Sequence, residues 1–411
     1  MRASNIITTI DIGSSKMRTI IGYFDAESQE DFHILGVGIS ESNAIRKGNI
    51  LDMEEFKNNL DQSLEEAEKM SGEEVSGAYI SFNSSSFEII KNKGIIAISG
   101  GEIIGEDIDR ALDMAKNGVD IPNREILKVI PENFIVDLEA GVKNPIGMSA
   151  RKLEVEANIF SMNLNVLNNI RKAVSDIGIE IFDIYPNLLS SPESVLSKRQ
   201  KELGVVHIDM GASTTGITVY EEGSLKYSAV IPTGGDNVTN DIALCLRTST
   251  SFAEKLKLEF AELNLEHMDG YIDREIDLSS LDAGEEGTLS LSYLSQIVTA
   301  RYDEIFFMIR EELKKIGKDG MLPEGAVCVG GATKIRGFVD LGKKSLKLPV
   351  FIGVPVSNDD LADASISDPV FASVIGTMIL SNKYSVPSKM FSLNIGGFFE
   401  SIIHTLKKLI P

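Results

Sequence analysis

Two stretches, 198 positions apart (209 minus 11), each combine an aspartate at the end of an apolar strand with glycine and hydroxyl residues. They read TTIDIGSSKMRTIIGY and VVHIDMGASTTGITVY. When the two aspartates are superposed, a glycine and a serine also coincide, in the pairs Asp11 with Asp209, Gly13 with Gly211 and Ser15 with Ser213. The chain therefore contains one chemical device twice.

Such a device suits the binding of phosphate and a metal ion. Glycine and other small residues in a tight turn let successive backbone N–H groups point at an anion. A carboxylate at the strand end suits Mg²⁺, which prefers one or two carboxylates plus phosphate oxygens. Either turn alone is equally compatible with an ordinary β-hairpin. The matching pair favours two jaws that hold a nucleotide's phosphates from both sides.

Three later stretches could complete a nucleotide site. IPTGGDNVTNDIALCL places Gly235 and Asp236 just before a predicted helix, whose N-terminus favours anions. Glu254 and Lys257 are spaced i, i+3 on a predicted helix, so they could reach one ligand or form a plain surface ion pair. VGGATKIRGF supplies a Gly-Gly turn with room for a flat ring against the backbone.

The elements that must position these residues indicate an α/β architecture. Near the N-terminus, apolar strands alternate with an amphipathic helix over about 52–70, which predicts a sheet covered on both faces. From 84 to 160 we expect a small inserted α/β unit with short strands and one helix over 106–117. The block 244–322 is predicted to be mostly helical and acidic, and the last helix of the body is predicted over 369–382.

Length and charge exclude several classes of protein. With 411 residues the chain should form two or more domains. A formal charge of −21 argues against nucleic acid as the main partner. No apolar run approaches the ~20 residues of a membrane span. Cys245 and Cys328 lie in apolar strings, so we expect both to pack in cores, as is typical of a reducing compartment.

The last stretch, SLNIGGFFESIIHTLKKLIP, predicts a short amphipathic helix behind a flexible Gly-Gly joint. From Val386 onward the formal charge is +2 (three lysines against Glu400), in a chain of −21. These properties favour a helix that lies in an anionic membrane surface, although it could instead dock on the protein's body or on another subunit. The residues predicted to act at the membrane are Phe398, Phe399, Ile402, Ile403, Leu406, Leu409 and Ile410, together with Lys407 and Lys408 on the polar face.

Over essentially its whole length the sequence resembles the FtsA family of actin-like bacterial cell-division proteins. DIGSSK and DMGASTTGI resemble the family's two phosphate motifs. GGDNVTNDIA with the following AEKLK resembles its phosphate and adenosine stretch, and VGGATKIRGF resembles its adenosine motif. The phosphate motifs are shared by the entire actin-like superfamily, whereas the inserted unit and the tail are specific to FtsA-like proteins.

The resemblance implies an α/β, actin-like (ribonuclease H-like) two-domain ATPase fold with a small inserted α/β subdomain and a C-terminal amphipathic helix. The implied parts are a first actin-like domain (1–83 and 161–203), the inserted subdomain (84–160), a second actin-like domain (204–243 and 323–385), its helical subdomain (244–322), and a flexible linker with the amphipathic helix (386–411).

The resemblance also implies ATP and Mg²⁺ as cofactors, with Mg²⁺ near Asp11 and Asp209. The implied ATP-binding residues are Asp11, Gly13, Ser14, Ser15, Lys16, Asp209, Gly211, Ala212, Ser213, Thr214, Gly235, Asp236, Glu254, Lys257, Gly330, Gly331 and Ala332. The family commonly has consecutive glycines where this chain has Ala212 and Ser213. No stretch supplies a general base, and we expect Glu193 to be solvated helix surface, so hydrolysis should be slow at most.

As a function, the resemblance implies self-association into filaments that tether the tubulin-like FtsZ ring to the cytoplasmic face of the cell membrane at the division site. The implied partners are the C-terminal peptide of FtsZ, which would bind the helical block, further copies of the chain, membrane lipids and other division proteins, with no nucleic acid. A PilM-type ATP-binding protein of pilus assembly is the alternative, since it shares the fold and the insert. A sugar kinase would need a catalytic carboxylate beside a sugar pocket, and a DnaK-type chaperone would need a further substrate domain.

Overall fold

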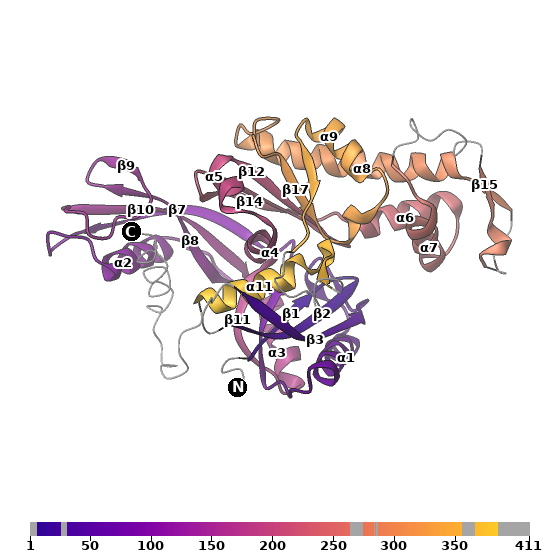
Figure 1. Ribbon diagram of the computed structural model, residues 1–411, viewed down its shortest axis with the longest axis horizontal. Coiled ribbons are helices and arrows are strands. Elements are labelled where there is room, and N and C mark those ends of the chain that lie inside the picture. Colours follow the sequence, from indigo (N-terminus) through magenta and orange to yellow (C-terminus); the bar gives the residue numbers. More distant parts are fainter. Residues whose placement is uncertain are drawn as a thin grey trace.

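The computed structural model describes residues 6–25, 31–263, 274–282, 284, 287–355 and 366–384. Two sheets with their helices form the centre of an elongated molecule, a smaller sheet extends from one side, and a helical block extends from the other (Figure 1). The predicted linker and amphipathic helix over 386–411, with the membrane-facing residues Phe398 to Ile410, lie outside the described residues.

The first central sheet has five strands in the order β11-β6-β1-β2-β3. β1 pairs antiparallel with β2 on one side and parallel with β6 on the other, so β1 is the central strand of the sheet. The strands are β1 (Ile6–Ile12), β2 (Lys16–Phe24), β3 (Phe32–Glu41), β6 (Gly77–Phe82) and β11 (Glu180–Pro186). A separate two-stranded hairpin joins β4 (Ile45–Arg46) to β5 (Asn49–Ile50).

Helices α1 (Met53–Ser71) and α3 (Leu164–Asp176) pack on this sheet through their apolar faces. α1 begins where the Asp52 side chain accepts hydrogen bonds from the first turn, and it ends at Gly72, which is left-handed with φ 72°. Its buried apolar side chains recur at helical spacing, as the sequence predicts: Phe56, Leu60, Leu64 and Ala67.

The second central sheet repeats the topology of the first, with the strand order β14-β13-β12-β17-β18. β12 pairs antiparallel with β13 and parallel with β17, which makes it the counterpart of β1. The strands are β12 (Val205–Met210), β13 (Thr215–Glu221), β14 (Ser224–Ile231), β17 (Ala326–Val329) and β18 (Val350–Ile352). This duplication places Asp11 and Asp209 at equivalent strand ends.

Helices α4 (Asn187–Val195) and α11 (Ala372–Tyr384) lie against each other between the two sheets (Figure 1). The approach is close at Gly376, where a Cβ atom would lie 1.9 Å from the backbone oxygen of Ser190. Only glycine fits there. The short helix α5 (Lys198–Leu203) leads from α4 into β12, and a 3₁₀ turn (Pro369–Phe371) leads into α11.

The insert, defined as β7 to β10 with α2, is a four-stranded sheet in the order β7-β10-β8-β9. Its strands β7, β8 and β10 have 10, 13 and 12 residues, so the expectation of short strands is wrong. Two register shifts between β8 and β10 interrupt the alternation of apolar residues and so hide the length of these strands in the sequence. The elements are β7 (Glu88–Ala97), α2 (Gly105–Asn117), β8 (Arg124–Val136), β9 (Glu139–Val142) and β10 (Lys152–Asn163).

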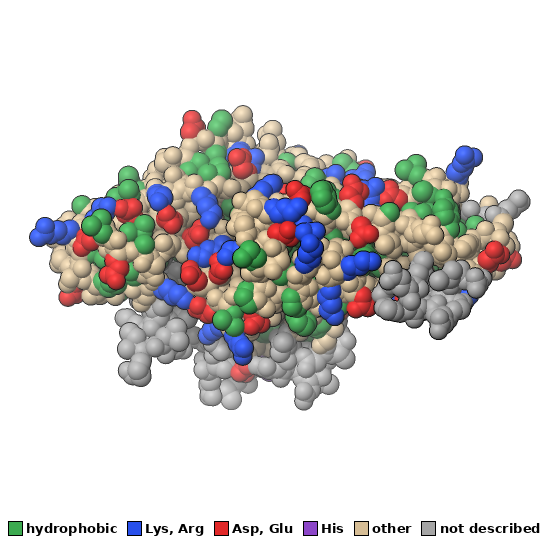
Figure 2. Space-filling model, turned by 90° about the horizontal axis from the view of Figure 1, so that it is seen from above, with side chains coloured by type: hydrophobic (Ala, Val, Ile, Leu, Met, Phe, Trp, Pro, Cys, Tyr) green, Lys and Arg blue, Asp and Glu red, His purple; other side chains and the backbone are tan. Residues whose placement is uncertain are grey.

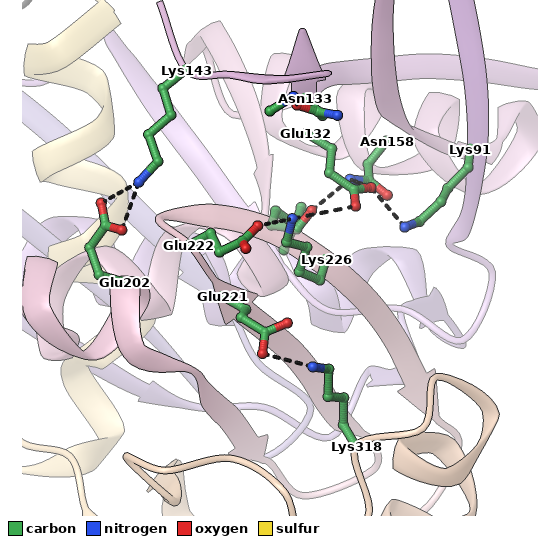
Figure 3. Close-up of polar contacts among 12 residues, drawn as sticks. Lys91, Glu132, Asn133, Lys143, Asn158, Glu202, Glu221, Glu222, Lys226 and Lys318 are labelled. Atoms are coloured by element: carbon green, nitrogen blue, oxygen red, sulfur yellow. Dashed lines mark hydrogen bonds and ion pairs between the residues drawn. The ribbon is translucent and has the colours of Figure 1, made fainter. Parts of the chain in front are cut away.

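The insert contacts the second sheet through polar side chains, as Figure 3 shows. Lys143 pairs with Glu202 of α5 at 2.7 Å, and Lys226 of β14 lies 3.9 Å from Glu132 of β8. The Asn158 amide donates to the backbone oxygen of Leu225 at 2.9 Å. The insert is therefore fixed to both halves of the body, because β7 also follows β6 of the first sheet and β10 leads directly into α3.

The described residues of the block over 244–322 are mostly helical, and they include a small hairpin that the sequence did not predict. Its strands β15 (Glu275–Asp277) and β16 (Thr288–Ser290) have three residues each, too few for a recognisable alternation. The helices at this side of the molecule are α6 (Gly235–Leu246), α7 (Thr250–Phe260), α8 (Leu291–Lys315) and α9 (Phe338–Leu346).

Cys328 is buried in β17, as expected, but Cys245 near the end of α6 is exposed, so the expectation that it packs in a core is wrong. A helix places neighbouring residues on different faces, and apolar neighbours in sequence therefore do not bury Cys245. Among the described helices, none is both long and apolar enough to cross a membrane.

Candidate functional site

The two Asp-Gly turns face each other across the space between the sheets. Ser14 Oγ in the β1–β2 turn lies 2.6 Å from Ser213 Oγ in the β12–β13 turn. Ser213 is 2% exposed, and its hydroxyl also accepts a hydrogen bond from the backbone N–H of Lys47 at 2.8 Å. Segments almost 200 positions apart therefore meet at one hydroxyl pair.

Backbone contacts within the turn and with Ser42 hold the rest of the first turn. A Cβ atom on Gly13 would lie 2.4 Å from the backbone oxygen of Lys16, so the turn requires glycine there. The oxygen of Ser15 accepts a hydrogen bond from the N–H of Ser42 at 2.8 Å. The Lys16 side chain is 42% exposed and pairs with Glu41 at 3.1 Å.

Asp11 and Asp209 are both buried at the base of the two turns, with 5% and 8% of their surface exposed. The Asn187 amide donates to Asp11 at 3.0 Å, and the Ser373 hydroxyl donates to Asp209 at 3.3 Å. Burial raises the pKa of Asp11. Burial, and then the negative charge of Asp11, raises the pKa of Asp209 to about 7. Two carboxylates that resist ionisation are a favourable place for a cation.

Arg18 is a residue of this site that the sequence reasoning missed. It lies directly opposite Asp11 in the antiparallel β1–β2 register, and its positive charge opposes the rise in pKa of both aspartates. Its Nε is buried without a hydrogen-bond partner among the described residues, as is Oδ1 of Asn187. The sequence could have revealed Arg18, because residues paired across an antiparallel ladder share a face of the sheet.

The second turn rests on the N-terminus of α6. The backbone N–H groups of Gly235 and Asp236 donate to the oxygens of Gly211 and Ala212 at 3.0 and 2.7 Å. Within the turn, the N–H of Gly211 donates to the oxygen of Thr214 at 2.9 Å. The pKa of Asp236 is raised, chiefly by burial. The structure thus brings the GGD stretch directly against the second jaw.

Glu254 and Lys257 form an ion pair at 2.6 Å that is more than a surface contact. The Lys257 side chain is 12% exposed, and its ammonium group also donates to Thr239 Oγ1 at 2.8 Å and to the oxygen of Gly235 at 3.3 Å. Glu254 in turn accepts a hydrogen bond from Thr239. The pair therefore fixes α7 against the start of α6.

The Gly-Gly turn after β17 lies beside both the end of β12 and the start of α6. Gly330 has φ 92°, and a Cβ atom there would lie 2.4 Å from the oxygen of Met210 and 2.9 Å from Asp209 Oδ1. A Cβ atom on Gly331 would meet nothing closer than Val370, at 4.0 Å. The Cβ of Ala332 lies 3.4 Å from where a side chain on Gly235 would begin. The predicted phosphate and adenosine stretches thus converge.

The expectation that Glu193 is solvated helix surface is wrong. Its side chain is 18% exposed and lies 2.6 Å from Lys201 and 3.7 Å from Lys383. Burial acts to raise its pKa, but the two lysines outweigh that effect and the pKa is lowered. Lys383 is 190 positions away in sequence (383 minus 193), so the pairing could not be read from local pattern. Glu193 is committed to ion pairs and is not a free base.

Solved structures identify the class of fold. A PilM–PilN complex of type IV pilus biogenesis has a TM-score of 0.65 at 13% identity, covering 92% of this chain and 98% of that one. MreB 5 of Spiroplasma citri bound to AMPPNP has a TM-score of 0.54 at 14% identity, covering 99% of this chain and 100% of that one. The duplicated sheets with facing turns define an actin-like protein, and the predicted fold class is confirmed for the described residues.

Sequence comparison then gives the family. Residues 206–376 match the model for cell division protein FtsA, and residues 84–161 match the model for the SHS2 domain inserted in FtsA. Cell division protein FtsA of Pseudomonas aeruginosa is 33% identical over 380 residues, covering 92% of this chain and 90% of that protein. The same protein of Bacillus subtilis is 33% identical over 359 residues, covering 86% and 80%. The chain belongs to the FtsA family of cell-division proteins, which confirms the resemblance.

Proposed function

We propose that this cell-division protein binds ATP with Mg²⁺ between the two facing turns. The observation that carries the proposal is the contact of Ser14 with Ser213, in two turns that each follow a buried carboxylate. It is supported by the Nε of Arg18, which has no hydrogen-bond partner in the part of the chain that the structure describes, and by the nucleotide named for the similar MreB structure. Nucleotide binding is also what the duplicated motifs predict.

In this proposal the phosphates lie between the backbones of the two turns, with Arg18 added as a positive group. Mg²⁺ would be held near Asp11 and Asp209 and would neutralise charge on the phosphates. The residues present fit the ion, because two carboxylates with raised pKa values gain from a cation nearby. Within the described residues no three or more His, Cys, Asp or Glu side chains gather around one point, so phosphate oxygens and water would supply the remaining ligands.

The adenosine would lie over Gly330, Gly331 and Ala332, with Glu254 and Lys257 at the ribose and base. The open space beside Gly331 supports this placement. Slow hydrolysis at most is proposed, since Glu193 is held by two lysines and the site offers no other assigned base.

For the cellular role we propose filaments of ATP-bound copies that tether FtsZ to the cytoplasmic face of the membrane as a peripheral protein at the division site. The C-terminal peptide of FtsZ would bind the helical block (244–322), and the helix within 386–411 would bind lipid. One short helix binds reversibly, whereas a row of them on a filament binds firmly. Positive and negative side chains are interspersed on the face seen in Figure 2, which gives no support to a nucleic-acid partner.

The alternative, a PilM-type role in pilus assembly, has only the likeness of fold in its favour. That likeness comes at 13% identity, whereas the FtsA relatives match at about 33%. We also propose that the domain boundaries predicted from the sequence, with an inserted subdomain over 84–160, are the domain boundaries of the protein.

Flotation with anionic liposomes tests the tether. The full chain should float, MgATP should strengthen its flotation, and a chain that ends at Pro387 should remain in solution. If both chains remain in solution with and without MgATP, the membrane role is wrong and the last helix serves docking or assembly.

A further inference from the structure

The hydroxyl of Ser213 joins the two halves of the molecule at the mouth of the proposed nucleotide site. It meets Ser14 Oγ at 2.6 Å and accepts the backbone N–H of Lys47 at 2.8 Å. Both partners belong to segments around the first sheet, whereas Ser213 belongs to the second. A glycine at this position could form neither bond.

Both ends of this connection are firmly anchored. On the first side, the oxygen of Lys47 accepts hydrogen bonds from Ser84 Oγ and from the N–H of Ser85, each at 3.2 Å. On the second side, the turn that carries Ser213 is closed by its own hydrogen bond and rests on the N-terminus of α6. A bond between two anchored segments resists their separation, whereas a bond between two loose loops would not.

We propose that the Ser213 hydroxyl is a tether across the cleft, a positioning group that slows cleft opening and therefore slows the release of a bound nucleoside phosphate. The inference rests on the proposed nucleotide site and adds control of its exchange rate. A ligand held between two jaws can leave only when the jaws separate, and separation here must break both hydrogen bonds of one buried hydroxyl.

Two neutral hydrogen bonds of ordinary net strength correspond to about a fivefold to 150-fold change in an equilibrium. If the bonds are intact in the bound state and broken in the open state, Ser213→Ala should release ADP faster by about that factor. Ser213→Gly should do the same, and Ser213→Thr, which keeps the hydroxyl, should stay near the natural rate. Ser14→Ala removes one bond and should give a smaller acceleration.

Thr218→Val provides a matched control. The Thr218 hydroxyl is buried on β13 of the same sheet and donates to the oxygen of Leu188 in α4 at 2.9 Å. Valine has nearly the same shape, so this variant loses a buried hydrogen bond between the two halves away from the cleft. It should lower thermal stability without changing the release rate.

The experiment is a stopped-flow measurement on the full chain with Mg²⁺, in which a fluorescent ADP is displaced by excess ATP. Faster release in Ser213→Ala and Ser213→Gly, with natural release in Thr218→Val, supports the tether. Release at the natural rate from both Ser213 variants, in protein that binds ADP, overturns the tether and leaves the proposed function intact. If the natural chain binds no nucleotide, the proposed function itself is wrong and the tether falls with it.

Discussion

The two buried aspartates predict that the nucleotide site destabilises the empty protein at neutral pH. The folded state holds a proton on Asp209 up to a pKa of about 7, whereas an ordinary aspartate loses its proton near pH 3.8. Between these pH values the folded state binds more protons than the unfolded state, so the free energy of unfolding falls as pH rises. At about 1.4 kcal/mol per pKa unit, the difference amounts to about 4 kcal/mol once the pH exceeds 7.

Asp209→Asn should remove most of this cost, because the amide has the same shape, cannot ionise, and can still accept the hydrogen bond from Ser373. Without nucleotide and with a chelator present, we expect the variant to be more stable than the natural chain at pH 8, by up to about 4 kcal/mol. The difference should narrow to about 2 kcal/mol at pH 5, because the unfolded aspartate keeps its proton only below about pH 3.8. The gain in stability should be accompanied by weaker MgATP binding, since the variant lacks a metal-binding charge.

Urea unfolding at pH 5, 6, 7 and 8 measures both effects, and Ser373→Ala serves as a control that removes one hydrogen bond and leaves the carboxylate. A variant that is less stable than the natural chain at pH 8, or a difference that does not change with pH, would refute the reasoning.

Three further tests of the geometry use five substitutions. Gly331→Val should abolish ATP binding and leave the circular dichroism spectrum unchanged, because a side chain there meets open space in the protein. Gly330→Val should instead unfold the chain, because its side chain would overlap the backbone. ATP binding retained in Gly331→Val would refute the assignment. Arg18→Met should weaken ATP binding by about tenfold to 100-fold, as expected for the loss of a charged hydrogen bond. Lys16→Met should weaken it much less, and calorimetry measures both. The reverse order would indicate that Lys16, not Arg18, is the main positive group at the phosphates. Gly376→Ala should lower the free energy of unfolding by more than about 3 kcal/mol in denaturant titrations, because the Cβ would overlap the α4 backbone; an unchanged midpoint would contradict the packing.

Much of the fold and part of the site could be predicted from the sequence, because the signals are local. The spacing of Phe56, Leu60 and Leu64 gives α1, and the repeated Asp-x-Gly pattern marks the ends of β1 and β12. These patterns depend on the chain within a few residues of each position. The duplication then implies that the two turns have equivalent places in two similar sheets.

What could not be predicted depends on contacts between distant segments. Asn187 and Ser373 reach the two aspartates from α4 and α11, and nothing near them in sequence indicates a ligand site. Glu193 looks like helix surface until Lys383 is placed beside it. Arg18 is different, since its pairing opposite Asp11 follows from the β-hairpin register and could have been deduced.

The most direct test of the central claim is calorimetric titration of the full chain with ATP, first with Mg²⁺ and then with a chelator. We expect saturable binding of one ATP per chain that weakens strongly without Mg²⁺. An absence of saturable binding under both conditions would contradict a nucleotide site between the two turns.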